Sequence, residues 1–393
     1  MQSKETTALR GILSLVVFSA VTVCSAASAL AQTETVLYSF QGSPDGEIAC
    51  CGQPVLDKVG NAYGTTLDGG ANSLGTVWKV TPSGTETVLW SFGSGSDGDT
   101  PVGLIMDKHG NLFGTTLGGG ADNLGTVFEI TPSGTETVLW NFGNGTDGTQ
   151  PGNGVILDNN GNLFGTTQTG GAYNGGTVYE LTPSGTETIL WSFGNGNDGM
   201  APDGTILNVN GTLYGTTRLG GGVPDSGTVW ELSPSGTETV LHSFVTQEGG
   251  QPDGNVVMDA KGNLYGNCHT GGPNEDGTVF KLTPSGKLKV IHAFDGTDGI
   301  NPYALIVLDK KGNLYSTTHE GGTYNGGTVW ESTRSGKLTV LWNLGNGTDG
   351  NETTSGVALD RQGNVYGMTQ YGGTGICHKG TRPGCGVVFK VTP

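Results

Sequence analysis

The chain has 393 residues, a formal net charge of −17 and 73 glycines, and only 13% of its residues are charged. An acidic protein of this kind repels phosphate backbones, which argues against nucleic acid as a partner. Glycine is well above average usage, but no Gly-X-Y period accompanies it. The apolar residues alternate as they do in strands, so collagen and disorder are excluded.

The N-terminus indicates export. A basic start is followed by an apolar run at residues 12–20 and by small residues up to Ala31. This order is typical of a secretory signal peptide, and the run is too short to span a membrane. We expect residues 1–31 to be a signal peptide and residues 32–393 to form one secreted, periplasmic or extracellular domain. A lipoprotein acylated at Cys24 is the alternative, although a bulky valine precedes this cysteine where a small residue is expected.

A seven-residue motif, Gly-Asn-Leu-Tyr/Phe-Gly-Thr-Thr, recurs along the chain with modest variation. Successive copies start 50 or 51 residues apart, so each belongs to one unit of a regular repeat. A period of this length indicates a propeller, a solenoid or an array. The seven copies start at Gly60, Gly110, Gly161, Gly211, Gly262, Gly312 and Gly363.

One repeat predicts four short strands. In residues 101–142 we expect strands at 101–107, 112–116, 125–130 and 135–142, because β-branched and aromatic residues alternate there between turn segments. The segments Asp-x-x-Gly-Asn and Thr-Pro-Ser-Gly favour tight turns. In the fourth strand, period-two alternation places one set of residues on a common side, with Leu139 on the other. This set is Glu136, Val138, Trp140 and Phe142.

Four antiparallel strands per repeat and no helical period favour an all-β, seven-bladed β-propeller over a β-helix. The mature chain starts with a fourth strand at residues 33–40 and ends with a third strand at residues 386–393. We expect the two fragments to complete the last blade. The N-terminal strand then closes the ring and removes exposed sheet edges.

The repeat also carries a family resemblance. Its phrases Gly-Asn-Leu-Tyr-Gly-Thr-Thr, Gly-Thr-Val-Phe and Leu-Thr-Pro-Ser-Gly resemble the GloVer tandem repeat, a family of choice-of-anchor exported bacterial proteins. The resemblance covers essentially all of the mature chain. It implies a secreted or envelope protein, and it brings no family activity or catalytic residues. The Asp-x-x-Gly-Asn-Leu-Tyr turn is also similar, at the level of fold, to NHL and gluconolactonase-like propellers.

A binding site is expected on the face of the propeller that carries the longer loops. The residue after Thr-Thr is leucine in the first two repeats and polar in the other five. We expect these residues and their neighbours to form an arc near the mouth of the central channel that binds a glycan, a peptide or a partner protein. The alternative is drift of the repeat where packing is loose. The candidate residues are Gln168, Arg218, His269, His319, Gln370, Tyr173, Tyr324, Glu320 and Tyr371.

No catalytic motif stands out, since the sequence has no Gly-x-Ser-x-Gly elbow, His-Glu-x-x-His pair or phosphate loop. We expect a monomeric, non-enzymatic binding module with no cofactor and no metal. The alternative is an extracellular lyase or a hydrolase of the lactonase type, with His269, His319 and a calcium ion at the channel mouth. Two other histidines, His242 and His292, take the register of packed tryptophans in the fourth strand, so we expect a structural role for them.

Aspartates in the loops before the first strands also suit calcium. Their context, Asn-Gly-Thr-Asp-Gly, lacks the alternating ligands of a calcium loop, so turn formation is favoured. These residues are Asp45, Asp97, Asp147, Asp198, Asp298 and Asp349.

Four of the five mature cysteines lie near the predicted ring closure: Cys50, Cys51, Cys377 and Cys385. An exported chain meets an oxidising compartment in which disulfides persist. Because a bond between adjacent cysteines is strained, we expect two long-range disulfides that join the loops, with a local bond between Cys377 and Cys385 as the alternative. The fifth, Cys268, is expected to stay free.

Overall fold

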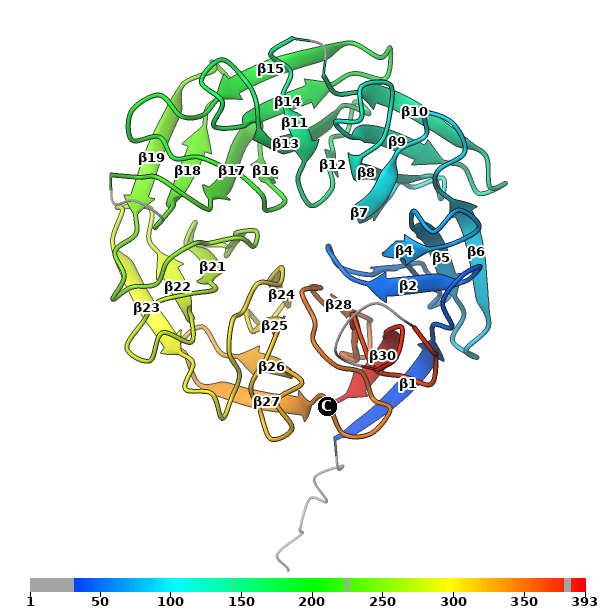
Figure 1. Ribbon diagram of the computed structural model, residues 1–393. Helices are drawn as coiled ribbons and strands as arrows, with labels where there is room; N and C mark the ends of the chain where they lie inside the picture. Colours follow the sequence, from blue (N-terminus) through cyan, green and yellow to red (C-terminus); the bar gives the residue numbers. More distant parts are fainter. Residues whose placement is uncertain (1–31, 144, 223–225, 378–382) are drawn as a thin grey trace, which may run out of the picture. The chain divides into compact units, whose positions relative to one another are not determined.

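The computed structural model describes residues 32–143, 145–222, 226–377 and 383–393. Seven antiparallel sheets are arranged as blades around a central axis (Figure 1). Each blade has four strands across, and in two blades the innermost strand is split into two pieces. The predicted seven-bladed β-propeller is confirmed, and no helix occurs among these residues. The expected signal peptide, residues 1–31, lies outside the described part of the chain.

The blades are numbered in chain order, and their strands run from the channel outward. Blade 1 contains β2 (Gly46–Ala49), β3 (Val55–Leu56), β4 (Ala62–Gly69), β5 (Thr76–Val80) and β6 (Glu86–Ser91). Blade 2 contains β7 (Asp99–Met106), β8 (Leu112–Gly118), β9 (Thr126–Ile130) and β10 (Glu136–Asn141). Blade 3 contains β11 (Thr149–Pro151), β12 (Ile156–Leu157), β13 (Leu163–Thr169), β14 (Thr177–Leu181) and β15 (Glu187–Ser192). Blade 4 contains β16 (Leu207–Val209), β17 (Thr212–Thr217), β18 (Thr228–Leu232) and β19 (Glu238–Ser243).

The remaining three blades follow the same plan. Blade 5 contains β20 (Val257–Met258), β21 (Leu264–Cys268), β22 (Thr278–Leu282) and β23 (Leu288–Ala293). Blade 6 contains β24 (Val307–Leu308), β25 (Leu314–Thr318), β26 (Thr328–Ser332) and β27 (Leu338–Asn343). Blade 7 contains β28 (Ala358–Leu359), β29 (Val365–Met368), β30 (Val387–Thr392) and the N-terminal strand β1 (Thr33–Ser39).

The ring is closed by the two ends of the domain. Strand β1 pairs with β30 in antiparallel register, from Thr33 opposite Thr392 to Ser39 opposite Val387 (Figure 1). Without β1, the backbone groups of β30 would form an open edge. The predicted closure by the N-terminal strand is therefore confirmed.

A bulge in each outermost strand corrects the predicted alternation. In β10 the register shifts between Val138 and Trp140, so Leu139 is an extra residue, and an equivalent shift occurs in all seven blades. Trp140 and Phe142 pack into the core shared with blade 3. The cross-strand partners of Glu136 and Val138 belong to the core shared with blade 1. The prediction of one common side was wrong because the bulge moves Trp140 and Phe142 to the opposite face.

The repeated motif serves turn formation and cohesion. In the first repeat the Asp57 carboxylate accepts hydrogen bonds from the Val59 and Asn61 backbone amides, the Asn61 side chain and the Tyr63 hydroxyl, at 2.7–3.2 Å. One side chain therefore fixes the turn and the start of the next strand.

The two threonines of the motif have different partners. The hydroxyl of the second, Thr66, lies 2.8 Å from that of Thr76 on the neighbouring strand. The hydroxyl of the first donates across the blade interface, as from Thr115 to the Gly152 carbonyl at 2.9 Å. Equivalent interblade bonds run from Thr216 and Thr317.

The four loop cysteines form two local disulfides, Cys50–Cys51 and Cys377–Cys385. The long-range pairing was therefore wrong. The Ile48 amide donates to the carbonyl of Cys385, so Ile48 is level with the final loop, whereas the Cys51 carbonyl further along accepts from the amide of Gly103 in blade 2. The chain thus carries the first cysteine pair away from the second. Cys268 is buried and free, as expected.

Candidate functional site: a polar arc on the loop face

The polar residues after Thr-Thr lie against a second variable position, which is the residue after the proline that recurs at the entrance to most blades. Gln168 of blade 3 donates through Nε2 to Asp203 Oδ1 at the entrance to blade 4, at 2.8 Å. Arg218 of blade 4 forms an ion pair with Asp253 at the entrance to blade 5, with 3.5 Å between Nε and Oδ1. Successive blades are therefore joined by complementary polar pairs.

Blades 5 and 6 continue this arrangement with rings. The ring of His269 stacks on that of Tyr303, with 4.3 Å between centroids and 27° between planes. The ring of His319 meets the Tyr303 ring edge-on, with 5.5 Å between centroids. Nδ1 of His269 lies 2.5 Å from Asp253 Oδ2 and 2.9 Å from the carbonyl of Gln251. Both neighbours are acceptors, so Nδ1 carries the proton and donates to them.

The arrangement ends in blade 7, where Gln370 donates through Nε2 to the hydroxyl of Thr354 at 3.1 Å. We call the complete set the polar arc. It consists of Gln168, Asp203, Arg218, Asp253, His269, Tyr303, His319, Thr354 and Gln370. Five of the nine predicted binding residues therefore lie in the arc. Contacts run from Arg218 to His319 through Asp253, His269 and Tyr303, whereas Gln168 with Asp203 and Gln370 with Thr354 are separate pairs.

The other four predicted residues have separate positions. Tyr173 and Tyr324 are half exposed, and their carbonyls lie beside the glycines that follow the outermost strands β15 and β27. No ring contact or side-chain hydrogen bond joins them to the polar arc among the described residues. The backbone of Tyr371 pairs with Asn351 in an isolated bridge. Glu320 follows His319 directly and lies next to the arc.

The arc contains two neighbouring aspartates, Asp203 and Asp253, and one arginine, Arg218. Burial, and next the negative charge of Asp253, raise the pKa of Asp203 to about 7, while Gln168 and Arg218 oppose this rise. Asp253 is 7% exposed, and its Oδ1 atom makes no hydrogen bond to any described residue. Arg218 faces it with a side chain that is 46% exposed. A buried acceptor without a hydrogen bond is costly unless a ligand or water completes it.

Sequence analysis missed four members of the arc: Asp203, Asp253, Tyr303 and Thr354. The signal was available in the position after the proline, which is Val102 and Gly152 in repeats 2 and 3 and becomes acidic or aromatic in repeats 4 to 6. This second register changes in the same part of the chain as the first. Comparing the two registers across neighbouring repeats, rather than within one repeat, would have paired them.

A large cavity lies at the opposite end of the channel, where the turns of the innermost strands meet. It has a volume of about 920 Å³ and is lined mainly by aliphatic residues of the innermost strands in blades 1, 2, 6 and 7. Lysines 310 and 311 and Arg361 lie on the turns at its rim. The polar arc does not line this cavity, so the two ends of the channel differ in chemistry.

The aspartates proposed as turn formers have that role. Asp97 accepts from the amides of Gly93 and Ser94 and from the indole of Trp90, at 3.0–3.2 Å. His242 and His292 replace such tryptophans, and their Nε2 atoms lie 2.9 and 2.7 Å from Glu248 and Asp298. Each histidine also packs edge-on against a buried phenylalanine two residues later. The predicted structural role of both histidines is confirmed.

The fold defines the class of protein: a seven-bladed β-propeller built from sequence repeats. On one face of this propeller the repeats differ from one another and carry the polar arc. Within that class, the chain belongs to the Gloeobacter/Verrucomicrobia repeat family, whose model matches residues 21–160 and 134–309. The resemblance predicted from the repeat is thereby confirmed. No curated protein matches the sequence.

Solved propellers with other sequences share the fold. Virginiamycin B lyase from Staphylococcus aureus is 12% identical with a TM-score of 0.61, over 92% of this chain and 99% of that one. The extracellular domain of a hybrid two component system from B. thetaiotaomicron is 14% identical with a TM-score of 0.57, over 92% of this chain and 41% of that one. At these identities the likeness concerns the fold alone.

Proposed function

We propose that the polar arc binds a hydroxyl-rich ligand such as an oligosaccharide, and that the protein is an exported binding module. The observation that carries this proposal is the Asp253 carboxylate, which is buried at the arc with one oxygen lacking a hydrogen bond beside a half-exposed guanidinium. A ligand hydroxyl would complete that oxygen, and the guanidinium would donate to a neighbouring hydroxyl. Sites of this kind combine a rigid scaffold with a few convergent polar groups.

Export is part of the same proposal. The protein has two disulfides, and such bonds persist in oxidising compartments rather than in the cytosol. No helix in the described part of the chain is long and apolar enough to cross a membrane. Free oligosaccharides and cell-wall glycans are ligands that an exported protein meets. A peptide or a protein surface is the competing ligand class, and the binding test below separates the two.

A second candidate function rests on Asp203. A carboxyl group with a pKa of about 7 is suited to donate or accept a proton near neutral pH. Asp203 lies close enough to Asp253 for the charge of one to raise the pKa of the other, and Asp253 in turn orients His269. This arrangement suits a lyase or a hydrolase acting on the bound ligand.

Arg218→Ala tests the binding function, and Arg334→Ala is its matched control. Both arginines are 46% exposed and both form an ion pair with a buried aspartate, but Arg334 pairs with Asp259 on the turn face, at 4.0 Å. On a glycan array we expect wild type and Arg334→Ala to bind the same glycans and Arg218→Ala to bind at least tenfold more weakly. Equal binding by all three proteins, or binding only to a peptide array, would contradict the proposal.

The enzymatic candidate is tested on the glycans that bind. Wild type and Asp203→Asn would be incubated with each glycan, and the products separated by chromatography. Turnover by wild type that is lost in Asp203→Asn, with binding retained, would favour catalysis. Binding without any product in either protein favours the binding module.

A further inference from the structure

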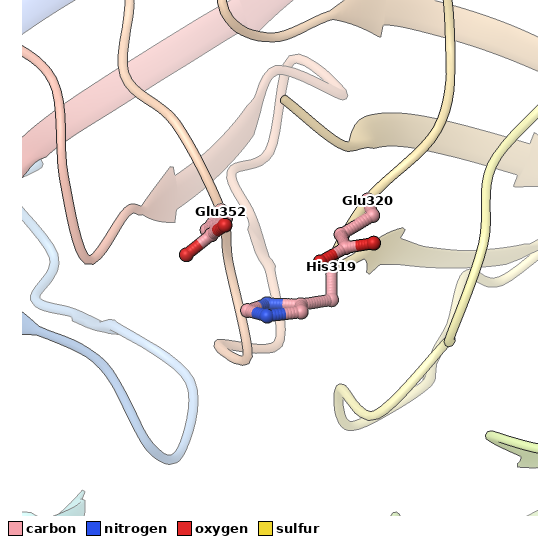
Figure 2. Close-up of side chains that lie close together, drawn as sticks. All are labelled: His319, Glu320 and Glu352. Carbon is pink, nitrogen blue, oxygen red and sulfur yellow. The ribbon is translucent and has the colours of Figure 1, made fainter. Parts of the chain in front are cut away.

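Three potential metal ligands lie together where blade 6 meets blade 7. His319 and Glu320 follow strand β25, and Glu352 lies in the loop that enters blade 7 (Figure 2). One ligand atom from each side chain lies within 4.8 Å of the other two. All three side chains are partly buried, so solvent reaches the cluster.

The backbone fixes these positions before any ligand arrives. The amides of His319 and Glu320 donate to the carbonyls of Asn301 and Ile300, both at 3.1 Å. The Glu352 amide donates at 2.9 Å to a carbonyl of blade 6, and its own carbonyl accepts from blade 7 at 2.8 Å. Glu352 has a φ of 52°, in the left-handed region. The fold sets this conformation, because the equivalent residues of five other blades share it: Thr100, Gln150, Ala201, Gln251 and Asn301.

The repeat supplies an internal comparison. At the junction of blades 5 and 6 the three equivalent residues are His269, Thr270 and Asn301, and Asn301 has nearly the same φ of 54°. At the junction of blades 3 and 4 they are Gln168, Thr169 and Ala201. Only at the junction of blades 6 and 7 does the sequence place an imidazole and two carboxylates at these three registers. The same backbone conformation therefore occurs both at the junction that carries one histidine and two glutamates and at junctions that do not.

We propose that His319, Glu320 and Glu352 bind a divalent transition-metal ion, for which Zn²⁺ is the probe. One imidazole with two carboxylates is a donor set that suits such ions, whereas calcium and magnesium prefer oxygen alone. Two carboxylates this close repel each other, and a divalent cation between them removes that repulsion. Zinc donors lie about 3.4 Å apart in a tetrahedral site, so each side chain needs to move by only about 1 Å.

The metal site stands independently of ligand binding at the rest of the arc. Three protein ligands leave a coordination position for water or for an oxygen of a bound molecule. The site shares His319 with the arc, and the ring of His319 contacts that of Tyr303. A bound ion would therefore add a Lewis-acidic group at one end of the arc.

The experiment uses the whole exported chain, stripped with EDTA and titrated with Zn²⁺ by calorimetry. The variants take their residues from equivalent positions in other blades, so the backbone tolerates them: His319→Gln, Glu320→Thr and Glu352→Asn. Glu248→Gln is the control because it disrupts a histidine–glutamate pair of 2.9 Å outside the cluster. We expect one Zn²⁺ per chain in wild type and control, and at least tenfold weaker binding in each of the three variants.

Folding is checked by thermal unfolding without metal, where the variants should match wild type. Zn²⁺ should then raise the melting temperature of wild type and the control but not of Glu352→Asn. The proposal is overturned by absence of saturable Zn²⁺ binding, by equal binding in Glu352→Asn, or by binding of Ca²⁺ or Mg²⁺ in place of Zn²⁺. In the first two cases the three side chains lie together without forming a metal site.

Discussion

A carboxyl group buried between blades makes the protein less stable as the pH rises. Glu136 begins strand β10, and its Oε1 is buried without a hydrogen bond to any described residue. Burial, and next the charge of Asp97 in the neighbouring blade, raise its pKa to about 7. Because the folded-state pKa is above the unfolded value, the stability that this group confers is complete below about pH 4.5 and is lost as the pH rises through 7.

The size of the expected stability change follows from the shift in the pKa of Glu136. A change from 4.5 to about 7 corresponds to about 3.4 kcal/mol at full strength. The carboxyl group is only partly buried, so solvent screening reduces the expected effect to about 1 kcal/mol. Four more glutamates have the same raised pKa and an equally unsatisfied oxygen at other blade interfaces, so their effects should add. They are Glu34, Glu86, Glu187 and Glu238.

The assay is urea unfolding of wild type, Glu136→Gln and the fivefold Glu→Gln variant at pH 5.0 and pH 8.5. We expect the free energy of unfolding of wild type to fall between these pH values. Glu136→Gln should recover about 1 kcal/mol of that fall, and the fivefold variant about 5 kcal/mol. Glu275→Gln, an exposed loop change, is the control and should leave the pH dependence unaltered. Equal pH dependence in wild type and the fivefold variant would refute the reasoning.

Three further predictions concern the ring and its cysteines. Deletion of residues 32–40 should expose β30 and an edge of blade 7, so the truncated protein should aggregate in size-exclusion chromatography, and a stable monomer would contradict the closure. Non-reducing peptide mapping should recover Cys377 linked to Cys385 and no peptide that joins residues 50–51 to the final loop. Cys268 should react with maleimide only after unfolding, because burial raises the pKa of its thiol and excludes the reagent.

The sequence determines most of the architecture because every blade repeats the same local signals. Asp57 and its equivalents fix turns through hydrogen bonds within seven residues, which a local pattern can predict. The bulge at Leu139 was missed because it changes the side of the sheet without changing composition. The cysteine pairing was missed for a related reason: both pairs lie near the closure, and only the hydrogen bond from the Gly103 amide to the Cys51 carbonyl shows how the chain separates them.

The candidate site was predictable in part, because one of its two registers departs visibly from the repeat. Gln168, Arg218 and His269 were found through that register. Their partners Asp203 and Asp253 lie about 35 residues further along the chain, and only the packing of one blade on the next brings them into contact. A search within single repeats cannot detect such pairs.

Some substitutions in one blade are accompanied by substitutions in the next blade. They show whether differences between repeats can arise from packing alone, without a ligand. Where an outermost strand starts with leucine instead of glutamate, as at Leu288 and Leu338, the blade before it carries His242 or His292 instead of tryptophan. Leu288 packs on the core that contains the strand partner of His242, so this pair of changes meets at one interface. Packing alone can therefore couple changes between repeats.

The polar arc differs from these packing changes in the hydrogen bonds of its buried groups. The imidazole of His242 reaches a carboxylate at 2.9 Å, and the pair is complete within the protein. Asp253 has two cationic or donor neighbours, Arg218 and His269, yet one of its oxygens still lacks a hydrogen bond although the residue is buried. An unsatisfied buried acceptor costs about 1–3 kcal/mol wherever it occurs, and the glutamates at the blade interfaces carry such an oxygen as well. Asp253 differs from those glutamates because the half-exposed guanidinium of Arg218 lies beside its Oδ1 atom, so the ligand proposed for the arc would contact both groups at once.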